Sequence, residues 1–200
     1  MPHAIVFDLF GVIARTQTEE AKRRIEDVAG VASVPFRDAY WADRPAYDAG
    51  QPGADYWAQV AERLGVRYAP ETVDALIEAD LASWLDVDDR MVEVVAELAG
   101  QGRSLGLLSN IVGDLVPVFE ERHRSWLRYF TALTYSCRIG VAKPDPRAYK
   151  ISAEQLGVLP RDVIFFDDSE RNVVAAREVG MTAEVFTSPD QVRRRLGLDA

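Results

Sequence analysis

Four short runs of β-branched and aromatic residues constrain the fold of this chain more than any other feature. They are HAIVF (3–7), SLGLLS (104–109), VIFF (163–166) and TAEVF (182–186), and stretches with helical periodicity separate them. Strands that alternate with helices form a parallel sheet covered on both faces, because each crossover places a helix against the sheet. The sequence therefore predicts an α/β fold with a doubly wound parallel sheet, whose sites lie at the carboxyl ends of the strands.

Residues 15–86 interrupt this alternation, because they contain three or four successive helical segments and no strand. The turns AGVASVP and AGQPGA separate helices within this region. The alternating pattern resumes at VDDRMVEVVAELAGQG, a helical segment with acidic residues at its start and glycines at its end. We therefore expect an all-helical insertion in the α/β core. The expected helices are TEEAKRRIEDVAG, PFRDAYWADRPAYDAG, ADYWAQVAERLG and PETVDALIEADLASWL.

The composition limits the partners of the chain. The formal net charge is −9 and the pI is near 4.8, so a nucleic acid or an anionic membrane would repel the surface. A single cysteine, Cys137, excludes an intramolecular disulfide. The start MPHAIVFD lacks the basic segment and long apolar core of a signal peptide, and no apolar run is long enough to span a bilayer. We expect a soluble cytoplasmic protein with a small-molecule ligand, and the sequence gives no signal for its oligomeric state.

Several polar side chains come directly after the predicted strands, and one precedes a proline. Singly, each has an ordinary explanation as a turn residue, a helix cap or a solvated charge. Together they resist it, because the carboxyl ends of neighbouring parallel strands converge on one crevice. The set is Asp8 after AIVF, Ser109 and Asn110 after LGLL, Lys143 in GVAKPDP, and Asp167 with Asp168 after VIFF.

Three of these side chains are carboxylates, which repel one another when they are clustered. A bound divalent cation resolves the repulsion, and a hard ion such as Mg²⁺ suits carboxylate, carbonyl and water oxygens. A carboxylate with Mg²⁺ on one side and serine, asparagine and lysine donors on the other is equipped for phosphoryl transfer, in which it attacks phosphorus in line. The residues therefore predict phosphoryl-transfer chemistry with Mg²⁺ as cofactor.

The stretches VFDLFGVI, LGLLSN, VAKPDPRAY and VIFFDDSERNVVAAREVGM follow one another in a recognisable order. They resemble the four motifs of the haloacid dehalogenase superfamily of hydrolases, in the branch with a helical cap of the C1 type and paired acids in the fourth motif. The resemblance covers about the whole chain. It implies a core over residues 1–14 and 87–200, and a cap over residues 15–86 that closes over the site and selects the substrate.

The resemblance also implies a role for each matched residue. Asp8 would be the nucleophile that forms an aspartyl-phosphate, with its other oxygen on Mg²⁺. Ser109 and Asn110 would bind the transferring phosphoryl group, and Lys143 would neutralise Asp8 and the phosphate. The implied activity is that of a phosphatase acting on a small phosphorylated metabolite.

The metal site implied by the resemblance contains one departure from the family pattern. Asp168, with Asp167 beside it, would hold Mg²⁺, and Asn172 stands where many relatives have another acid. The position of Phe10 is usually a second aspartate, which protonates the leaving oxygen while its backbone carbonyl ligates the metal. Phe10 can supply only the carbonyl. General acid–base help is worth roughly 10²–10⁴ in rate, so we expect an enzyme that is slow or restricted to good leaving groups.

Two alternatives follow from Phe10. The 2-haloacid dehalogenases of the same superfamily also lack the second aspartate and displace halide without a metal, but they have no use for the pair Asp167 and Asp168. A site retained for binding a phosphorylated ligand or partner without turnover is the other alternative, because a fold by itself does not establish activity.

The expected cap contains a further candidate site in YWADRPAYDAG. Arg44 could clamp a substrate anion and Tyr47 could form a pocket wall, although both could equally serve the packing of the cap. For Trp41 and Trp57 we expect a packing role. The remaining candidates are expected to be structural: His3 and His123 have no partner at metal-ligand spacing, and Cys137 resembles a small buried hydrophobe.

Overall fold

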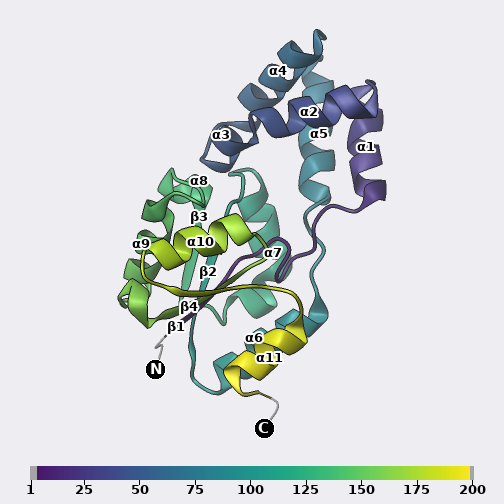
Figure 1. Ribbon diagram of the computed structural model, residues 1–200. Coiled ribbons are helices and arrows are strands. Elements are labelled where there is room, and N and C mark those ends of the chain that lie inside the picture. The colour runs from purple at the N-terminus through teal and green to yellow at the C-terminus, as the bar shows by residue number, and fades with distance from the viewer. Residues whose placement is uncertain (1–3, 199–200) are drawn as a thin grey trace.

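The computed structural model describes residues 4–198 and contains one five-stranded parallel sheet (Figure 1). The strand order is β3-β2-β1-β4-β5, so that β1 lies at the centre with β2 and β4 as its neighbours. The predicted α/β class with a doubly wound parallel sheet is confirmed. The strands are β1 (Ala4–Phe7), β2 (Ser104–Ser109), β3 (Ala132–Tyr135), β4 (Val163–Asp167) and β5 (Thr182–Val185).

The edge strand β3 is absent from the strands that the sequence predicts. It is only four residues long, ALTY, and helices precede and follow it closely. Its pairing with β2, from Gly106 opposite Ala132 to Ser109 opposite Tyr135, places it in the sheet. Tertiary pairing therefore determines this strand, whereas local propensity does not.

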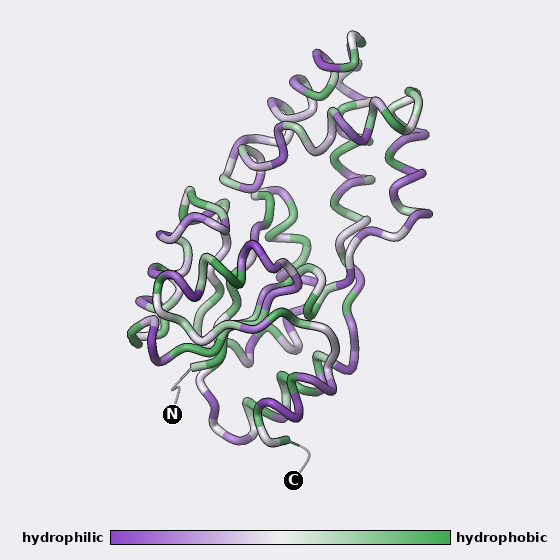
Figure 2. The backbone as a smooth tube through the Cα atoms, in the orientation of Figure 1, coloured by the Kyte–Doolittle hydropathy of each residue, from purple (hydrophilic) through white to green (hydrophobic). Residues whose placement is uncertain are grey.

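Helices cover both faces of the sheet, as the alternating pattern predicts. Along β1, Val6 packs into the cluster beneath one face, while Phe7 packs into the cluster on the other. In Figure 2 the strands are mainly green, in agreement with their burial on both sides. One face carries α9 (Pro146–Gln155) and α10 (Glu170–Glu178); the other carries α6 (Asp89–Gly100), α7 (Leu115–Leu127) and α11 (Pro189–Leu196).

The helical insertion follows β1 and forms a separate layer above the carboxyl ends of the strands (Figure 1). Its helices pack on one another, with α1 against α5 and α4 against both α2 and α5. Within residues 4–198, no helix is long and apolar enough to cross a membrane. The inserted helices are α1 (Glu19–Ala29), α2 (Ser33–Ala42), α3 (Arg44–Asp48), α4 (Gly53–Leu64) and α5 (Pro70–Ala82).

The second expected helix of the insertion is two helices. The chain leaves helical geometry at Asp43, with φ −109° and ψ 4°, and re-enters a helix at Arg44 with Pro45 in its first turn. Proline is tolerated there because its missing N–H would have no partner within the helix. The break turns the short helix α3 down towards the sheet, where it meets α8 (Ser136–Ile139).

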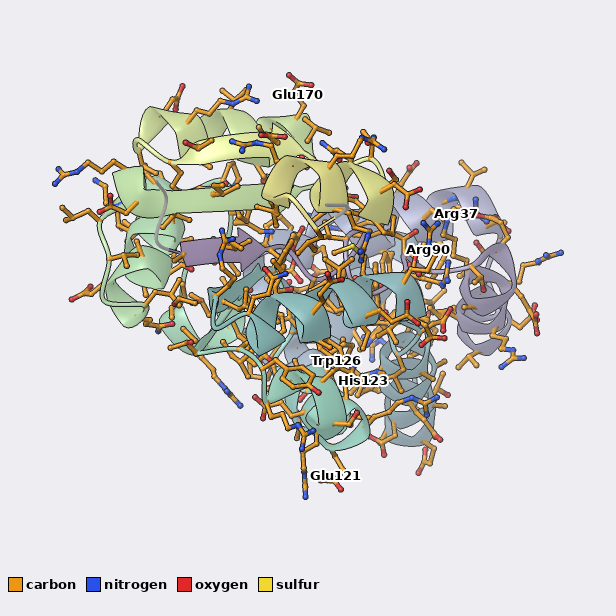
Figure 3. All side chains as sticks on the ribbon, turned by 90° about the horizontal axis from the view of Figure 1, so that it is seen from below. Arg37, Arg90, Glu121, His123, Trp126 and Glu170 are labelled. Atoms are coloured by element: carbon orange, nitrogen blue, oxygen red, sulfur yellow. The ribbon has the colours of Figure 1, made fainter. Side chains whose placement is uncertain are left out.

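A buried histidine joins the core to the segment that returns from the insertion. His123 lies on α7 beside Trp126, with ring centroids 5.6 Å apart (Figure 3). Its Nε2 donates to the carbonyl of Leu85, 3.0 Å away. The structural role expected for His123 agrees with this contact, whereas His3 lies outside the described residues.

Acid should weaken the fold through His123. Burial lowers the pKa of this imidazole below its ordinary value of about 6.5. As pH falls below about 6.5, the unfolded chain binds a proton that the native state does not, so the free energy of unfolding should decrease towards the lower native pKa. His123→Gln should flatten this part of the profile, measured by urea unfolding between pH 7.5 and 5.5. An unchanged slope would assign the pH dependence to other groups.

Candidate active site

The register of the sheet places Asp8 and Asp167 side by side. Phe7 on β1 pairs with Phe166 on β4, and the residue after each of them is an aspartate. The N–H of Asp8 donates to the carbonyl of Phe166 at 2.8 Å, which continues the ladder by one residue. Both carboxyl groups are buried, so they lie where repulsion between them is strong.

Lys143 resolves this repulsion. Its Nζ lies 2.6 Å from Asp8 Oδ1 and 2.6 Å from Asp167 Oδ2, and the ammonium is itself buried. The lysine comes from the segment between α8 and α9, whose backbone is held by Asn110. The amide of Asn110 donates to the carbonyl of Lys143 at 2.9 Å and accepts from its N–H at 2.8 Å. Asn110 therefore positions Lys143.

The electrostatics of the cluster follow from burial and close charges. Burial raises the pKa of Asp8 well above its ordinary value, opposed by Lys143 and reinforced by Asp167. For Lys143, burial disfavours the ammonium, but the two carboxylates outweigh it and raise its pKa. The lysine is thus held in its charged form between two acids. Such an arrangement holds the Asp8 carboxyl in place in a buried position.

The third carboxylate, Asp168, approaches the loop after β1. Gly11 adopts φ +84°, and a Cβ there would lie 2.1 Å from Asp168 Oδ2, so only glycine leaves room for this approach. Burial, followed by the charge of Asp167, raises the pKa of Asp168. One oxygen from each of Asp8, Asp167 and Asp168 lies within 4.8 Å of the others. This set of hard oxygen donors fits Mg²⁺.

Asp167 has further contacts that fix its side chain. Its Oδ1 accepts from the N–H of Ser169 at 2.8 Å and from Nδ2 of Asn172 at 3.0 Å. Asn172 therefore supports the carboxylate of Asp167. Ser109, the last residue of β2, is fully buried, and its hydroxyl donates to the carbonyl of Asn110 at 3.3 Å.

A cavity of about 140 Å³ lies between the sheet and the inserted helices. Asp8, Asn110, Lys143 and Asn172 line its floor from the core. This volume is below the roughly 300–1,000 Å³ of pockets that enclose drug-sized ligands. The cavity therefore suits a small substrate.

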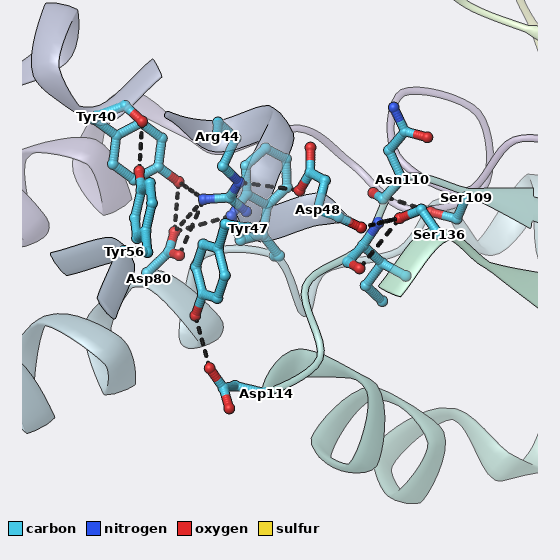
Figure 4. Close-up of polar contacts among 12 residues, drawn as sticks. Tyr40, Arg44, Tyr47, Asp48, Tyr56, Asp80, Ser109, Asn110, Asp114 and Ser136 are labelled. Atoms are coloured by element: carbon cyan, nitrogen blue, oxygen red, sulfur yellow. Dashed lines mark hydrogen bonds and ion pairs between the residues drawn. The ribbon is translucent and has the colours of Figure 1, made fainter. Parts of the chain in front are cut away.

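The cap side of the cavity carries Arg44, whose guanidinium is held by three neighbours (Figure 4). Nη1 donates to the Tyr40 hydroxyl at 2.5 Å and to Asp80 Oδ2 at 3.1 Å, and Nε donates to Asp48 Oδ1 at 3.2 Å. The Tyr40 hydroxyl in turn donates to Asp80 at 2.5 Å. Asp80, fully buried on α5, is the residue of this network that sequence reasoning missed, because nothing in its helical pattern distinguishes it from a solvated acid.

Two further polar contacts join α3 to the core, and Figure 4 shows both. The Tyr47 hydroxyl donates to Asp114 Oδ2 at 3.0 Å. The Ser136 hydroxyl donates to the carbonyl of Asp48 and accepts from the N–H of Ile111 at 2.9 Å. Tyr47 is fully buried and does not line the cavity in the described structure, so its contacts are those of a residue that seats the cap on the core.

Aromatic side chains complete the cavity wall. Phe10 meets Trp84 edge-on, with ring centroids 5.0 Å apart and an interplanar angle of 63°. Trp57 is fully buried in the cap, as expected, whereas Trp41 is 52% exposed and lines the cavity. Cys137 is half-buried, and burial raises the pKa of its thiol, in agreement with a structural role.

The comparisons with known proteins agree with this geometry. The family model for haloacid dehalogenase-like hydrolases matches residues 2–180. The chain belongs to this family. Among characterised hydrolases of the family, a phosphatase of Mycobacterium tuberculosis is 29% identical over 198 residues, which cover 95% of this chain and 89% of the relative. A phosphorylated carbohydrates phosphatase of Thermotoga maritima is 24% identical over 183 residues, covering 89% and 82%.

Solved structures of other hydrolases in the family share the fold. A HAD family enzyme of Bacteroides thetaiotaomicron, in complex with magnesium and inorganic phosphate, superposes with a TM-score of 0.76 at 19% identity, covering 94% of this chain and 95% of that one. The L-2-haloacid dehalogenase of Xanthobacter autotrophicus, with chloropropionic acid covalently bound, gives 0.70 at 19% identity, covering 98% and 83%. The same fold thus occurs in an enzyme bound to magnesium and phosphate and in a dehalogenase.

Removal of the lysine charge should destabilise this HAD hydrolase. Lys143→Met leaves Asp8 and Asp167 buried without their counter-charge, and breaking such a pair costs about 3–5 kcal/mol. Urea unfolding at pH 7.5 in the presence of EDTA measures the loss. The exposed Lys150, changed to Met, is the matched control and should have little effect. Equal effects of the two changes would show that the charge of Lys143 does not hold the site together.

Proposed function

We propose that this HAD hydrolase is a Mg²⁺-dependent phosphatase that acts on a small phosphorylated metabolite through an aspartyl-phosphate on Asp8. The observation that carries the proposal is the buried Asp8 carboxyl, held by Lys143 at the floor of a cavity that the inserted helices close. Phosphatases related over most of the chain support it. We assign residues 15–86 to a cap and residues 1–14 and 87–200 to the core.

In this proposal Asp8 is the nucleophile, and Leu9 and Lys143 position its carboxyl group. Both the Leu9 N–H and Lys143 engage Asp8 Oδ1, at 2.7 and 2.6 Å, so we assign the attack on phosphorus to Oδ2. The Asp8–phosphorus bond forms as the bond to the leaving oxygen breaks, and water then hydrolyses the aspartyl-phosphate to regenerate Asp8. Lys143 offsets the negative charge of both the phosphoryl group and the nucleophile.

Ser109 and Asn110 are assigned to the phosphoryl side of the site. The side chain of Asn110 holds Lys143 through two hydrogen bonds, so we propose that it acts on the phosphate chiefly by placing the lysine. Ser109 is buried at the end of β2, and its hydroxyl would have to leave the carbonyl of Asn110 to reach a phosphate oxygen. Its contribution should therefore depend on bound substrate.

The metal site is assigned to Asp8, Asp167, Asp168 and the backbone carbonyl of Phe10. The close approach of Asp168 to Gly11 supports this set, because it places the carboxylate beside the Phe10 peptide. The structural neighbour bound to magnesium and phosphate offers a precedent within the fold. When bound there, Mg²⁺ would neutralise phosphoryl charge and favour in-line geometry.

A phosphatase assay with and without Mg²⁺ tests this proposal. The purified enzyme should release phosphate from acetyl phosphate, EDTA should abolish the release, and added Mg²⁺ should restore it. Asp8→Asn keeps the side-chain volume but removes the nucleophile, so its rate should fall by at least about 10³-fold. Circular dichroism of the variant controls for folding.

Other results point to other functions. Halide release from 2-chloropropionate that is indifferent to EDTA would identify a dehalogenase, the alternative that Phe10 favours. Binding of phosphorylated compounds without turnover would identify a binding protein. Retention of most phosphatase activity in a folded Asp8→Asn variant would exclude the covalent mechanism.

Phe10 should make the rate depend steeply on the leaving group. Its phenyl ring cannot protonate a departing oxygen, so aryl and acyl phosphates should be hydrolysed far faster than primary alkyl phosphates. Phe10→Asp should flatten a plot of log kcat/KM against leaving-group pKa, provided the carboxyl reaches the position of the ring edge. Phe10→Leu, which adds no acid, is the control. A shallow slope for the unmodified enzyme would mean that another group donates the proton.

A further inference from the structure

The cavity above Asp8 has two chemically different halves. The floor from the core carries the ionic cluster around Lys143, described above. Away from it, the wall is largely apolar and comes from the cap, the loop after β1, the loop after β2 and the start of α7. Its apolar members are Phe10, Trp41, Trp84, Ile111, Val112 and Leu115. A phosphoryl group on the floor would thus have its leaving group against this wall.

Among the described residues, Arg44 is the one cation of this wall, and its guanidinium is already paired with carboxyl groups. Arg44 is buried between the carboxyl groups of Asp80 and Asp48, and the Tyr40 hydroxyl accepts a third hydrogen bond from it. The rings of Tyr40 and Tyr47 lie 5.1 and 5.3 Å from its guanidinium carbon. With two acids on one guanidinium, no positive charge remains to bind a second anion of the substrate. Figure 4 shows this guanidinium among its partners.

The aromatic part of the wall is fixed in place. The Trp84 indole N–H donates to Asp80 Oδ1 at 3.1 Å, which orients the ring, and Phe10 packs edge-on against it. Phe10 is braced behind by Phe119, with centroids 6.1 Å apart. A preformed aromatic wall binds an apolar group with little cost in ordering.

Trp41 stands at the edge of this wall with half of its surface exposed. It packs edge-on against Tyr40, with centroids 4.9 Å apart, and also lines the cavity. The exposed face of this tryptophan is apolar area beside a small site, and a bound ligand would cover it.

We propose that the wall formed by Phe10, Trp41 and Trp84 selects phosphate esters whose leaving group is compact, uncharged and apolar, with aryl groups favoured. The inference rests on the proposed phosphatase function and names its substrate class. In this assignment Arg44 builds the wall and does not clamp a substrate anion. Substrates with a second phosphate or a carboxylate on the leaving group are disfavoured, because the wall offers them no free cation.

Two pairs of phosphate esters test the substrate class. Within each pair the leaving groups have similar basicity but differ in charge or polarity. Phenyl phosphate and 3-carboxyphenyl phosphate release phenols of similar acidity, and benzyl phosphate and glycerol 3-phosphate are both primary alkyl esters. The apolar member of each pair should have a kcat/KM higher by about tenfold or more. Acetyl phosphate, measured in parallel with Mg²⁺, reports the chemistry independently of the wall.

Substitution of Trp41 links the preference to the wall. Trp41→Ala should reduce the phenyl-to-carboxyphenyl ratio by at least about threefold, whereas Trp41→Phe should keep most of it. Val34→Ala, an exposed apolar residue on the same helix, is the matched control and should leave the ratio unchanged. Because both positions are exposed, the variants should fold normally, and circular dichroism checks this.

The outcomes separate the two proposals. Hydrolysis of acetyl phosphate with equal or greater activity on the anionic and polar esters would overturn the apolar wall and leave the phosphatase function standing. An unchanged ratio in Trp41→Ala would overturn the role of the wall in selection. Failure to hydrolyse any phosphate would instead overturn the proposed function.

Discussion

The ammonium of Lys143 between the carboxyl groups of Asp8 and Asp167 is the interaction on which the site depends. The parallel register of β1 and β4 forces the two acids together in a buried position, where they would repel one another. A single lysine satisfies both, and Asn110 holds the backbone of that lysine at two points. Folding and the geometry of the site are thus linked, because the contacts that make burial of the acids tolerable also hold two carboxyl groups and a cation at one point.

A second buried cation organises the cap. Arg44 joins helices α2, α3 and α5 through Tyr40, Asp48 and Asp80, so three helices of the cap meet at one guanidinium. The same network orients Trp84 towards the cavity. Arginine is well suited to bind a substrate anion, but Arg44 instead holds the helices of the cap together. The consequence is a closed, apolar wall opposite an ionic floor, and this contrast underlies the substrate class proposed above.

The two cations illustrate how similar groups acquire different roles. Lys143 lines the cavity from the core and contacts Asp8 and Asp167, whereas the guanidinium of Arg44 is paired within the cap itself. Phe10 lies between these two environments, after β1 and against Trp84. The side chain that departs from the family pattern therefore belongs physically to the wall.

The α/β class, the helical insertion and the convergence of Asp8, Lys143 and Asp167 were predictable from the sequence, because short β-branched runs and helical periodicity are local signals and parallel strands share one carboxyl edge. The sequence did not reveal strand β3, because this strand has only four residues and its pairing with β2 defines it. Nor could it assign Arg44, since its partner Asp80 lies 36 residues away on another helix. Such roles depend on which buried groups meet after folding, and only the tertiary structure decides that.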